Sequence, residues 1–386
     1  MQQRRRTIVH VVYRFAIGGL ENVIVQLVNR LPADRFDHVV LSLTDISDFR
    51  ERVTQPGVRF VALDKPPGHA VPLYPRIFRL LREIRPDVVH TCNLAALEIA
   101  PIAWLAGVPL RVHAEHGWDA HDTDGSNPRY RRLRRLYRPF VSHYVAVSQD
   151  LHDYLGRAVG VPAARRSLIA NGVDTAAFRP RTRSDDAGAE VAGWPFAPGD
   201  RIAGTVGRLQ TVKNQPLLAR AFVRLVRARP EAAARLRLAI VGEGPLRAEV
   251  ESVLEAGGVR HLAWLPGARN DVAAILRHLD CFVLPSQAEG TSCTLQEAMA
   301  CGLPAVATAV GGTPGLVDEG TTGHLVPPDD EAALADALWR VAGDPGHAAR
   351  LGGAARRRAL DDFALDGMVA RYDALFSSGR PTAARP

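Results

Sequence analysis

Short apolar runs alternate with amphipathic segments along the first 177 residues of the chain. Six runs that are rich in valine and bounded by turn residues or charges predict β-strands: TIVHVVYRF, DHVVLSLT, RFVALD, DVVHTC, RVHAEHG and HYVAVS. Segments 20–32, 71–86 and 94–107 carry apolar residues at three- and four-residue spacing, which predicts helices. Strands that alternate with helices in this way predict a parallel sheet covered on both faces.

The same alternation returns in the second half of the chain. Six further runs predict strands there: RIAGTVGRL, RLRLAIVGEGP, HLAWLPGA, CFVLPS, PAVATAV and GHLVPP. Between the two halves, residues 178–200 are rich in Pro, Gly, Ala and charge, which is typical of a linker. We therefore predict an N-terminal domain over residues 1–177 and a C-terminal domain over 201–361. An amphipathic helix near 362–377 and a flexible tail at 378–386 follow.

The predicted fold class is α/β, with two Rossmann-like halves and a cleft between them. In such sheets, ligands bind outside the carboxyl ends of the strands. Glycine clusters occupy this position after the first strand (IGGLEN) and later in VGRL, VGEGP, LPGA and GGTPG. This shared placement argues for a ligand site more strongly than any single motif does.

Composition is typical of a globular protein of a reducing compartment. Of the 386 residues, 47% are hydrophobic and 23% are charged, and the formal net charge is +7. The positive charge favours anionic partners such as phosphates, but no zinc-finger spacing or RNA-binding aromatic signature supports nucleic acid. The four cysteines lack CxxC spacing, which favours buried thiols. No run has the length of a signal-peptide core or a membrane span, so we expect a cytoplasmic protein.

Two cations follow the strand RIAGTVGRL. Arg208 comes directly after Gly207, and Lys213 follows in the same turn. Cations at the carboxyl end of a strand suit a diphosphate, with solvated surface charge as the alternative. Lysine occurs only at Lys65 and Lys213, so Lys213 is a candidate for a role that arginine does not fill. Gly242 in VGEGP would let the backbone approach a nucleotide, although any Rossmann turn needs glycine.

Two glutamates, Glu289 and Glu297, lie in the stretch AEGTSCTLQEAMACGLPAVATAVGGTPGLV. We place Glu289 in a loop and Glu297 in the helix that follows. The loop amides of Gly290, Thr291 and Ser292 would form an anion-binding cradle together with the N-terminal amides of this helix. Glu289 would bind sugar hydroxyls or stabilise a cationic sugar transition state, and Glu297 would accept from ribose hydroxyls. Glu297 also fits a capping box with Thr294, and both interpretations stay open.

The first half offers its own candidates. Gly18 and Gly19 open a helix after the first strand, where the backbone would approach phosphate or sugar. His116 ends the strand RVHAEHG on the same predicted rim, with a structural histidine as the alternative. Asp122 and Asp124 have the DxD spacing of metal-dependent nucleotide-sugar sites, but no acidic partner adjoins them, so we expect no metal site.

A basic helix is predicted at Arg129–Arg138. Its arginines indicate either a solvated face over the sheet or a contact with anionic lipid head groups. The second interpretation would bring the cleft to a lipid-linked acceptor and place the protein peripherally at the inner membrane face.

Together these stretches resemble glycosyltransferase family 4, whose members are retaining enzymes of the GT-B fold. The resemblance runs from IGGLENVIVQL through VSQDL, ANGVD and VGRLQTVKNQ to AEGTSCTLQEAMACGLPAVATAVGG, and so covers nearly the whole chain. The stretches HVVYRF, EHGWD, DGSN and RRLRRLYRP are similar to one branch of the family. That branch comprises sugar transferases associated with exopolysaccharide and exosortase (PEP-CTERM) systems.

The resemblance implies a role for each matching residue. Arg208 and Lys213 match the pair that grips the donor diphosphate, and Glu289 matches the glutamate near the transferred sugar. The remaining matches are Glu297 on the ribose, Gly19 in the glycine loop, His116 on the sugar, and Thr294 and Leu295 at helix-start amides. The family needs neither a metal nor a cofactor, and its final helix crosses back onto the first domain.

Two departures from the family pattern leave the sugar specificity open. Thr291 and Ser292 stand where many relatives have Phe-Gly or Phe-Pro, and Asn214 stands where a glycine usually follows the lysine. Neither departure removes a charged group.

We therefore expect a retaining, metal-independent enzyme that moves a sugar from a nucleotide-diphosphate donor to a glycan or lipid-linked acceptor. Two rival interpretations remain. A nucleotide-sugar epimerase of the same architecture would isomerise the donor without an acceptor. A non-catalytic protein that binds nucleotide sugars would bind the donor tightly without turnover.

Overall fold

The computed structural model describes residues 4–119, 122, 124–182 and 191–378, and the chain divides into two compact units. The N-unit comprises the chain up to Asn171 together with the segment from Asp366 onward, and the C-unit runs from Gly172 to Leu365. The predicted boundary lay at residue 177. The predicted tail, beyond Ser378, and residues 183–190 of the predicted linker lie outside the described residues.

A parallel sheet of seven strands forms the centre of the described N-unit, in the order β3-β2-β1-β4-β5-β6-β7. Its strands are β1 (Arg6–Val12), β2 (Phe36–Ser42), β3 (Arg59–Ala62), β4 (Val88–Cys92), β5 (Leu110–Glu115), β6 (His143–Ala146) and β7 (Arg166–Leu168). All six predicted strands are confirmed. β7 was not predicted, because its three residues at the sheet edge are half-buried or exposed and carry no apolar run.

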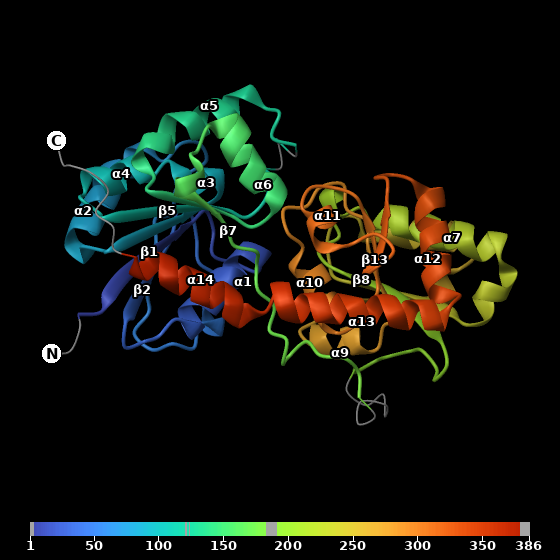
Figure 1. The fold of residues 1–386 in the computed structure, drawn as a ribbon. Coiled ribbons are helices and arrows are strands. Elements are labelled where there is room, and N and C mark those ends of the chain that lie inside the picture. Colours follow the sequence, from blue (N-terminus) through green and yellow to red (C-terminus); the bar gives the residue numbers. More distant parts are fainter. Residues whose placement is uncertain (1–3, 120–121, 123, 183–190, 379–386) are drawn as a thin grey trace. The chain divides into compact units, whose positions relative to one another are not determined.

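Helices cover both faces of this sheet (Figure 1). They are α1 (Gly19–Arg30), α2 (Tyr74–Ile84), α3 (Asn93–Leu97), α4 (Ala100–Leu105), α5 (Pro128–Tyr137), α6 (Gln149–Tyr154) and α14 (Leu365–Ser377). The single helix predicted at 94–107 is wrong, since α3 and α4 replace it. Pro101 lies in the first turn of α4, where its missing N–H leaves no intrahelical bond broken.

The last described helix, α14, belongs to the N-unit core. The guanidinium of Arg6 donates to the carbonyl of Phe376 at 2.9 Å, and Arg35 forms an ion pair with Asp373. The rings of Tyr372 and Phe376 are fully buried. α14 therefore packs on the same sheet face as α1, although more than 300 residues of chain separate the two helices (Figure 1).

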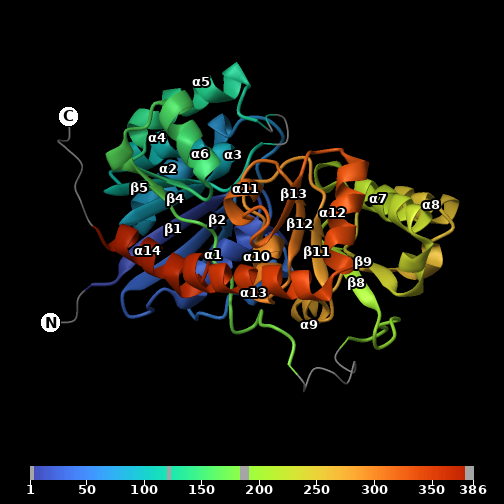
Figure 2. The same cartoon turned by 45° about the vertical axis from the view of Figure 1, so that its right-hand side comes forward.

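The C-unit is built in the same way around a six-stranded parallel sheet of the order β10-β9-β8-β11-β12-β13 in its described part. Its strands are β8 (Arg201–Val206), β9 (Leu236–Val241), β10 (Ala263–Gly267), β11 (Cys281–Leu284), β12 (Ala305–Thr308) and β13 (Gly323–Val326). Its helices are α7 (Gln215–Ala228), α8 (Arg247–Ala256), α9 (Val272–Arg277), α10 (Cys293–Ala300), α11 (Thr313–Leu316), α12 (Glu331–Ala342) and α13 (Pro345–Asp362). α7 packs against α12, and α10 against α13 (Figure 2). The prediction of two α/β domains with parallel sheets is confirmed.

Part of the segment expected as a linker is packed against the C-unit. Val191 is 3% exposed, and the ring centroid of Trp194 lies 5.1 Å from that of Trp264 on β10. Linker-like composition at 191–200 therefore coexists with an aromatic contact that anchors the segment to the sheet edge.

Candidate active site

Lys213 and Glu289 form an ion pair at the carboxyl edge of the C-unit sheet. Lys213 follows β8 and Glu289 follows β11, and these two strands are neighbours in the sheet. The Lys213 Nζ atom lies 2.6 Å from Oε1 of Glu289. The Lys213 side chain is 26% exposed and that of Glu289 is 7% exposed, so the pair is mostly shielded from water. The sequence placed each residue on this edge, but their pairing was not predicted.

A second donor holds the same carboxylate oxygen. The hydroxyl of Ser286 donates to Glu289 Oε1 at 2.6 Å, a contact that sequence reasoning missed. Glu289 Oε2 makes no hydrogen bond or ion pair with any residue that the structure describes. One carboxylate oxygen is therefore fixed, and the other keeps its capacity to accept from a ligand hydroxyl.

The backbone of Glu289 is fixed by the turn after β12. The Gly312 amide donates to the Glu289 carbonyl at 3.2 Å. Gly311 has φ +48°, and a Cβ atom there would stand 1.9 Å from the same carbonyl oxygen. Glycine is thus required at position 311 both by conformation and by space.

The turn that carries Lys213 ends in a left-handed residue. Asn214 has φ +51°, a conformation that glycine adopts freely and asparagine tolerates. Its side-chain amide donates to Asp329 Oδ1 at 2.7 Å, and the Gln287 amide donates to the Val212 carbonyl at 2.9 Å. Asparagine, at the position where the resemblance implies a glycine, therefore preserves the turn, and it adds a hydrogen bond to the loop after β13.

Arg208, by contrast, is poised without a partner. Its side chain is exposed, and its guanidinium forms no hydrogen bond or ion pair with any described residue. Gly207, directly before it, has open space around its Cα. Because Arg208 has no contact to break, binding an anionic ligand costs it no existing hydrogen bond or ion pair.

Gly242 has a structural requirement of its own. Its φ is +140°, and a Cβ atom there would lie 1.9 Å from the Gly207 carbonyl oxygen. The glycine thus allows the turn after β9 to pack on the turn after β8. Its predicted contact with a nucleotide stays a prediction.

The start of α10 differs from the capping box considered for Thr294 and Glu297. The helix begins at Cys293, and the hydroxyl of Ser292 caps it by accepting from the Leu295 amide at 3.3 Å. The capping-box interpretation is wrong, because Glu297 lies in the second turn rather than at the third helical position. Glu289 in the loop and Glu297 in the helix are placed as expected.

The anion cradle predicted at this helix start is only partly open. Thr291 and Ser292 are buried, whereas Gly290 and Thr294 are half-buried. Since the Leu295 amide already donates to Ser292, a phosphate there would have to compete with the cap. The roles assigned to Gly290, Thr291, Ser292, Thr294, Leu295 and Glu297 stay predictions.

In the N-unit, Gly18 and Gly19 begin α1 just beyond β1. Gly18 is the N-cap, with an extended φ of −172°, and it offers no side-chain cap. A Cβ atom at Gly18 would lie 2.1 Å from Oε2 of Glu21, which therefore folds back over the start of the helix. The helix N-terminus and a carboxylate thus lie together at this point.

His116 lies one residue beyond β5. Its amide donates to Oδ1 of Asn93 at 2.7 Å, a contact that sequence reasoning missed. Both ring nitrogens are buried, and a hydrogen bond with Asn171 leaves at least one of them without a partner among the described residues. Burial is the main cause that lowers the pKa of His116 to about 4, and the charge of Glu115 and the hydrogen bond with Asn171 offset it only in part. The imidazole is therefore neutral near pH 7 and keeps its hydrogen-bonding capacity.

Asp122 and Asp124 both act in the turn before α5. Asp122 accepts from the Asn127 amide at 2.8 Å, and Asp124 accepts from the Ser126 amide at 3.0 Å. Residue 123, between them, lies outside the described residues. The two carboxylates thus stabilise the entry into the basic helix.

One arginine of the basic helix faces the core instead of solvent. Arg134 is 1% exposed and binds Glu115 through Nε at 2.6 Å and through Nη2 at 3.2 Å. Its Nη2 also lies 3.1 Å from Asp119 Oδ2. Burial alone would raise the pKa of Glu115, but Arg134 and His113 outweigh it and hold the pKa well below its usual range. The helix therefore keeps exposed arginines such as Arg132 and Arg135 on its surface and turns Arg134 into the core, and the choice between a solvated face and a lipid contact stays a prediction.

Known family models match both units of the chain. A family model described as Glycosyltransferase Family 4 matches residues 17–177, and one described as Glycosyl transferases group 1 matches residues 200–344.

None of the described helices is both long enough and apolar enough to cross a membrane.

Similar proteins of known activity include two bacterial transferases. The UDP-Gal:alpha-D-GlcNAc-diphosphoundecaprenol alpha-1,3-galactosyltransferase of Escherichia coli is 27% identical over 350 residues, which cover 87% of this chain and 88% of that protein. The GDP-mannose-dependent alpha-(1-6)-phosphatidylinositol monomannoside mannosyltransferase of Mycolicibacterium smegmatis is 31% identical over 317 residues. That match covers 79% of this chain and 80% of the relative.

Among solved structures, Anabaena HepE in complex with UDP and glucose has a TM-score of 0.80 and 22% identity to this chain. The match covers 97% of this chain and 100% of that chain. At this identity the likeness shows the shared GT-B fold.

Proposed function

Since the chain belongs to glycosyltransferase family 4 and is a glycosyltransferase, we propose that it transfers a sugar from a nucleoside-diphosphate sugar to a glycan or lipid-linked acceptor. The donor class is supported by the names of similar proteins, which include a UDP-galactose and a GDP-mannose enzyme. The acceptor class is supported by the diphosphoundecaprenol and phosphatidylinositol acceptors in the same names.

The observation that carries this proposal is the cation arrangement at the carboxyl edge of β8. Lys213 is held at 2.6 Å from Glu289, and the guanidinium of Arg208 is exposed. A donor diphosphate would form an ion pair with Arg208. It would also compete with the Glu289 carboxylate for Lys213. Both cations would then stabilise the negative charge that develops on the leaving diphosphate.

The role proposed for Glu289 follows from this competition for Lys213. Once the diphosphate draws on Lys213, the carboxylate keeps the Ser286 hydroxyl as a donor, and its Oε2 atom accepts from a sugar hydroxyl. A carboxylate in this place also stabilises a sugar ring that gains positive charge as the bond to the diphosphate breaks.

We extend the proposal to a retaining reaction that needs no metal. The two cations supply the positive charge that a divalent metal gives in other transferases. Retention follows if the leaving phosphate takes the proton of the acceptor hydroxyl on the same face of the sugar. His116, neutral near pH 7, would orient the sugar by a hydrogen bond.

The cellular role that we propose is exopolysaccharide or cell-surface polysaccharide synthesis, in an exosortase-associated system, on the cytoplasmic side of a membrane. The surface around α5 supports a peripheral contact. Leu136, Trp104 and Leu105 are 62%, 41% and 61% exposed, and the Trp104 ring packs 5.4 Å from that of Phe140, just after α5. Exposed apolar groups beside the arginines of Arg129–Arg138 suit anionic lipid head groups.

The test is thermal stabilisation by a panel of nucleotides and nucleotide sugars in EDTA. Arg208→Ala is the informative variant, because the exposed, unpartnered guanidinium can be removed without breaking a contact. The matched control is Arg357→Ala, an exposed arginine on α13. A ligand at 100 times its Kd stabilises by about 2.7 kcal/mol. That corresponds to roughly 2–4 °C per kcal/mol for a domain of this size.

We expect one nucleoside diphosphate to stabilise the wild type and Arg357→Ala equally, and Arg208→Ala much less. Stabilisation that requires a divalent metal would contradict metal independence. Stabilisation by none of the ligands would contradict the proposed donor class.

A further inference from the structure

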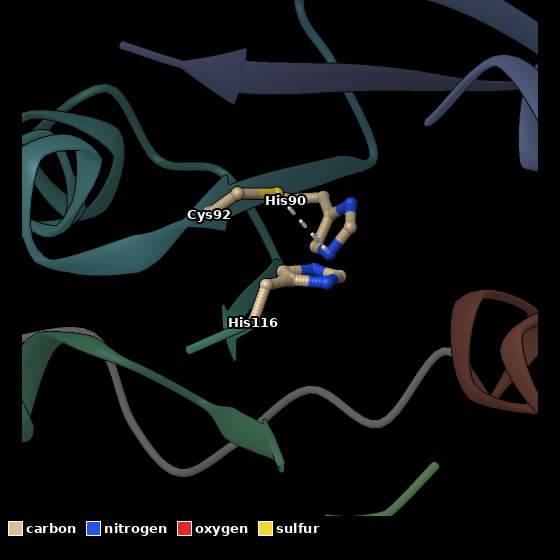
Figure 3. Close-up of side chains that lie close together, drawn as sticks. All are labelled: His90, Cys92 and His116. Carbon is tan, nitrogen blue, oxygen red and sulfur yellow. Dashed lines mark hydrogen bonds between the residues drawn. The ribbon is translucent and has the colours of Figure 1, made fainter. Parts of the chain in front are cut away.

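Three potential metal ligands meet beneath the carboxyl edge of the N-unit sheet. They are the imidazoles of His90 and His116 and the thiol of Cys92, and one ligand atom from each lies within 4.8 Å of the others (Figure 3). Nε2 of His90 and Sγ of Cys92 are 3.8 Å apart. None of the roles assigned to the active site uses His90 or Cys92.

The sheet register brings these side chains to one face. Alternate residues of a strand point to the same side, so His90 and Cys92 share a face of β4. Cys92 pairs with Ala114 of the neighbouring strand β5, and His116 follows two residues later in the same phase. Figure 3 shows the His116 ring lying across from the His90 ring.

The cluster contains unsatisfied polar groups. Both ring nitrogens of His116 are buried, and the hydrogen bond with Asn171 satisfies at most one of them. Buried polar atoms without a partner are costly, unless an ion or water completes them. His90 is 0% exposed and Cys92 is 1% exposed, so a ligand that fills the space would be shielded from competing water.

A row of histidines orients the His90 ring. Nδ1 of His90 lies 3.1 Å from Nδ1 of His10, and Nε2 of His10 lies 3.1 Å from Nδ1 of His38. If each ring donates along this row toward His38, Nε2 of His90 carries a lone pair that faces the thiol. Such outer hydrogen bonds commonly fix the tautomer of a metal-binding histidine.

We propose that His90, Cys92 and His116 bind a thiophilic divalent cation of the Zn²⁺ class. Zn²⁺ takes thiolate and imidazole ligands at about 2.0–2.3 Å, which places tetrahedral ligand atoms roughly 3.4–3.8 Å apart. The 3.8 Å between His90 and Cys92 lies at the upper end of this range, and the other separations are at most 4.8 Å. The fourth position falls to water, or to the carboxylate of Glu21, which acts electrostatically on the Cys92 thiol.

Binding has a defined proton balance. The Cys92 thiol loses its proton to solvent as the sulfur–metal bond forms, while the two imidazoles coordinate through neutral lone pairs. Each bound ion therefore releases one proton, and the affinity rises with pH.

The metal site also implies regulation of sugar transfer, an inference that rests on the proposed function. An ion that holds His116 withdraws its ring nitrogen from the sugar, so Zn²⁺ would inhibit transfer. A chelator would restore activity, because no reaction step that we propose needs the ion.

The test is Zn²⁺ binding by the metal-free full chain, measured by competition with a chromophoric chelator, for wild type and Cys92→Ala. Cys281→Ala is the matched control, since Cys281 is also a buried strand cysteine at 1% exposure. Circular dichroism verifies that each variant folds. We expect one ion per chain in the wild type and in the control, and at least tenfold weaker binding in Cys92→Ala.

Co²⁺ supplies a second readout that does not depend on a variant. Thiolate coordination gives Co²⁺ a sulfur-to-metal charge-transfer absorption, which we expect in the wild type. Absence of this absorption, no binding of Zn²⁺, or equal binding by Cys92→Ala would each overturn the proposal. Zn²⁺ binding without inhibition would overturn the regulatory role alone, and failure of donor binding would overturn the proposed function while leaving the metal site standing.

Discussion

The ion pair between Lys213 and Glu289 allows a prediction that separates stability from ligand binding. The perturbation is Lys213→Met, which keeps the apolar stem of the side chain and removes its charge. It leaves the Glu289 carboxylate, only 7% exposed, with Ser286 as its one remaining described donor. The C-unit should therefore lose stability even without a donor.

The magnitude follows from the burial of the pair. Exposed ion pairs contribute about 0.2–1 kcal/mol. Removing one partner of a fully buried pair costs about 3–5 kcal/mol. Since the Lys213 side chain is 26% exposed, the expected loss lies between these limits, at about 1–3 kcal/mol.

Glu289→Gln is the complementary variant. A carboxamide oxygen still accepts from Ser286 and Lys213, so the expected loss is smaller, about 1 kcal/mol. In the double variant the two losses should not add, and the coupling energy should be about 1–2 kcal/mol.

The assay is urea unfolding of the four proteins that make up the cycle, followed by tryptophan fluorescence, to which Trp194, Trp264 and Trp339 of the C-unit contribute. Arg357→Met serves as the control for loss of an exposed positive charge, and it should change stability by less than about 0.5 kcal/mol. A Lys213→Met variant as stable as this control, or a coupling energy of zero, would show that the pair is neither shielded from water nor energetically coupled.

Three further predictions concern other parts of the fold. Burial lowers the pKa of His38 from 6.5 to about 4, so the folded N-unit resists protonation of this side chain. The free energy of unfolding should therefore fall as the pH drops from 6.5 toward 4, by about 1.4 kcal/mol per pH unit for each such histidine. A urea-unfolding stability in EDTA that does not change with pH would contradict this. Gly311→Ala should cost more than about 2 kcal/mol and weaken donor binding, because its Cβ would meet a carbonyl oxygen at 1.9 Å; Gly315→Ala, which enters open space, should cost far less, and equal melting temperatures would count against the clash. Arg134→Met should destabilise the N-unit by about 3–5 kcal/mol, since it strands a buried carboxylate, whereas the exposed Arg132→Met should be nearly neutral in the same unfolding assay.

The fold was predictable because its signal is periodic. Apolar runs in valine-rich strands, separated by amphipathic helices, specified both parallel sheets. What failed was local. β7 is too short to show a pattern, and Pro101 marks the start of a second helix where a single one was expected.

The candidate site was predictable as a set of positions on strand ends, but its contacts were not. Lys213 and Glu289 are 76 residues apart in the chain, so only the order of β8 and β11 in the sheet brings their charges together. The capping box failed because Ser292, two residues before Thr294, offers its hydroxyl to the first turn. Spacing alone does not tell which of two capping residues begins a helix.

Buried polar residues were the hardest to foresee. Arg134 reads as one more arginine on a basic helix, yet it neutralises Glu115 inside the core. Likewise, His90 and Cys92 read as ordinary strand residues, and their proximity to His116 depends on the register between β4 and β5. Such pairings depend on tertiary structure.

Sugar transfer itself is the most direct test of the proposed function. The purified chain would be incubated in EDTA with the nucleotide sugar selected by the binding panel and with a polyprenyl-diphosphate-linked sugar acceptor, followed by mass spectrometry of the lipid and of the donor. We expect an acceptor lengthened by one sugar, release of the nucleoside diphosphate, and a loss of at least about 100-fold in rate for Glu289→Gln. A donor that is isomerised without an acceptor, or one that binds and is never consumed, would contradict the proposed function.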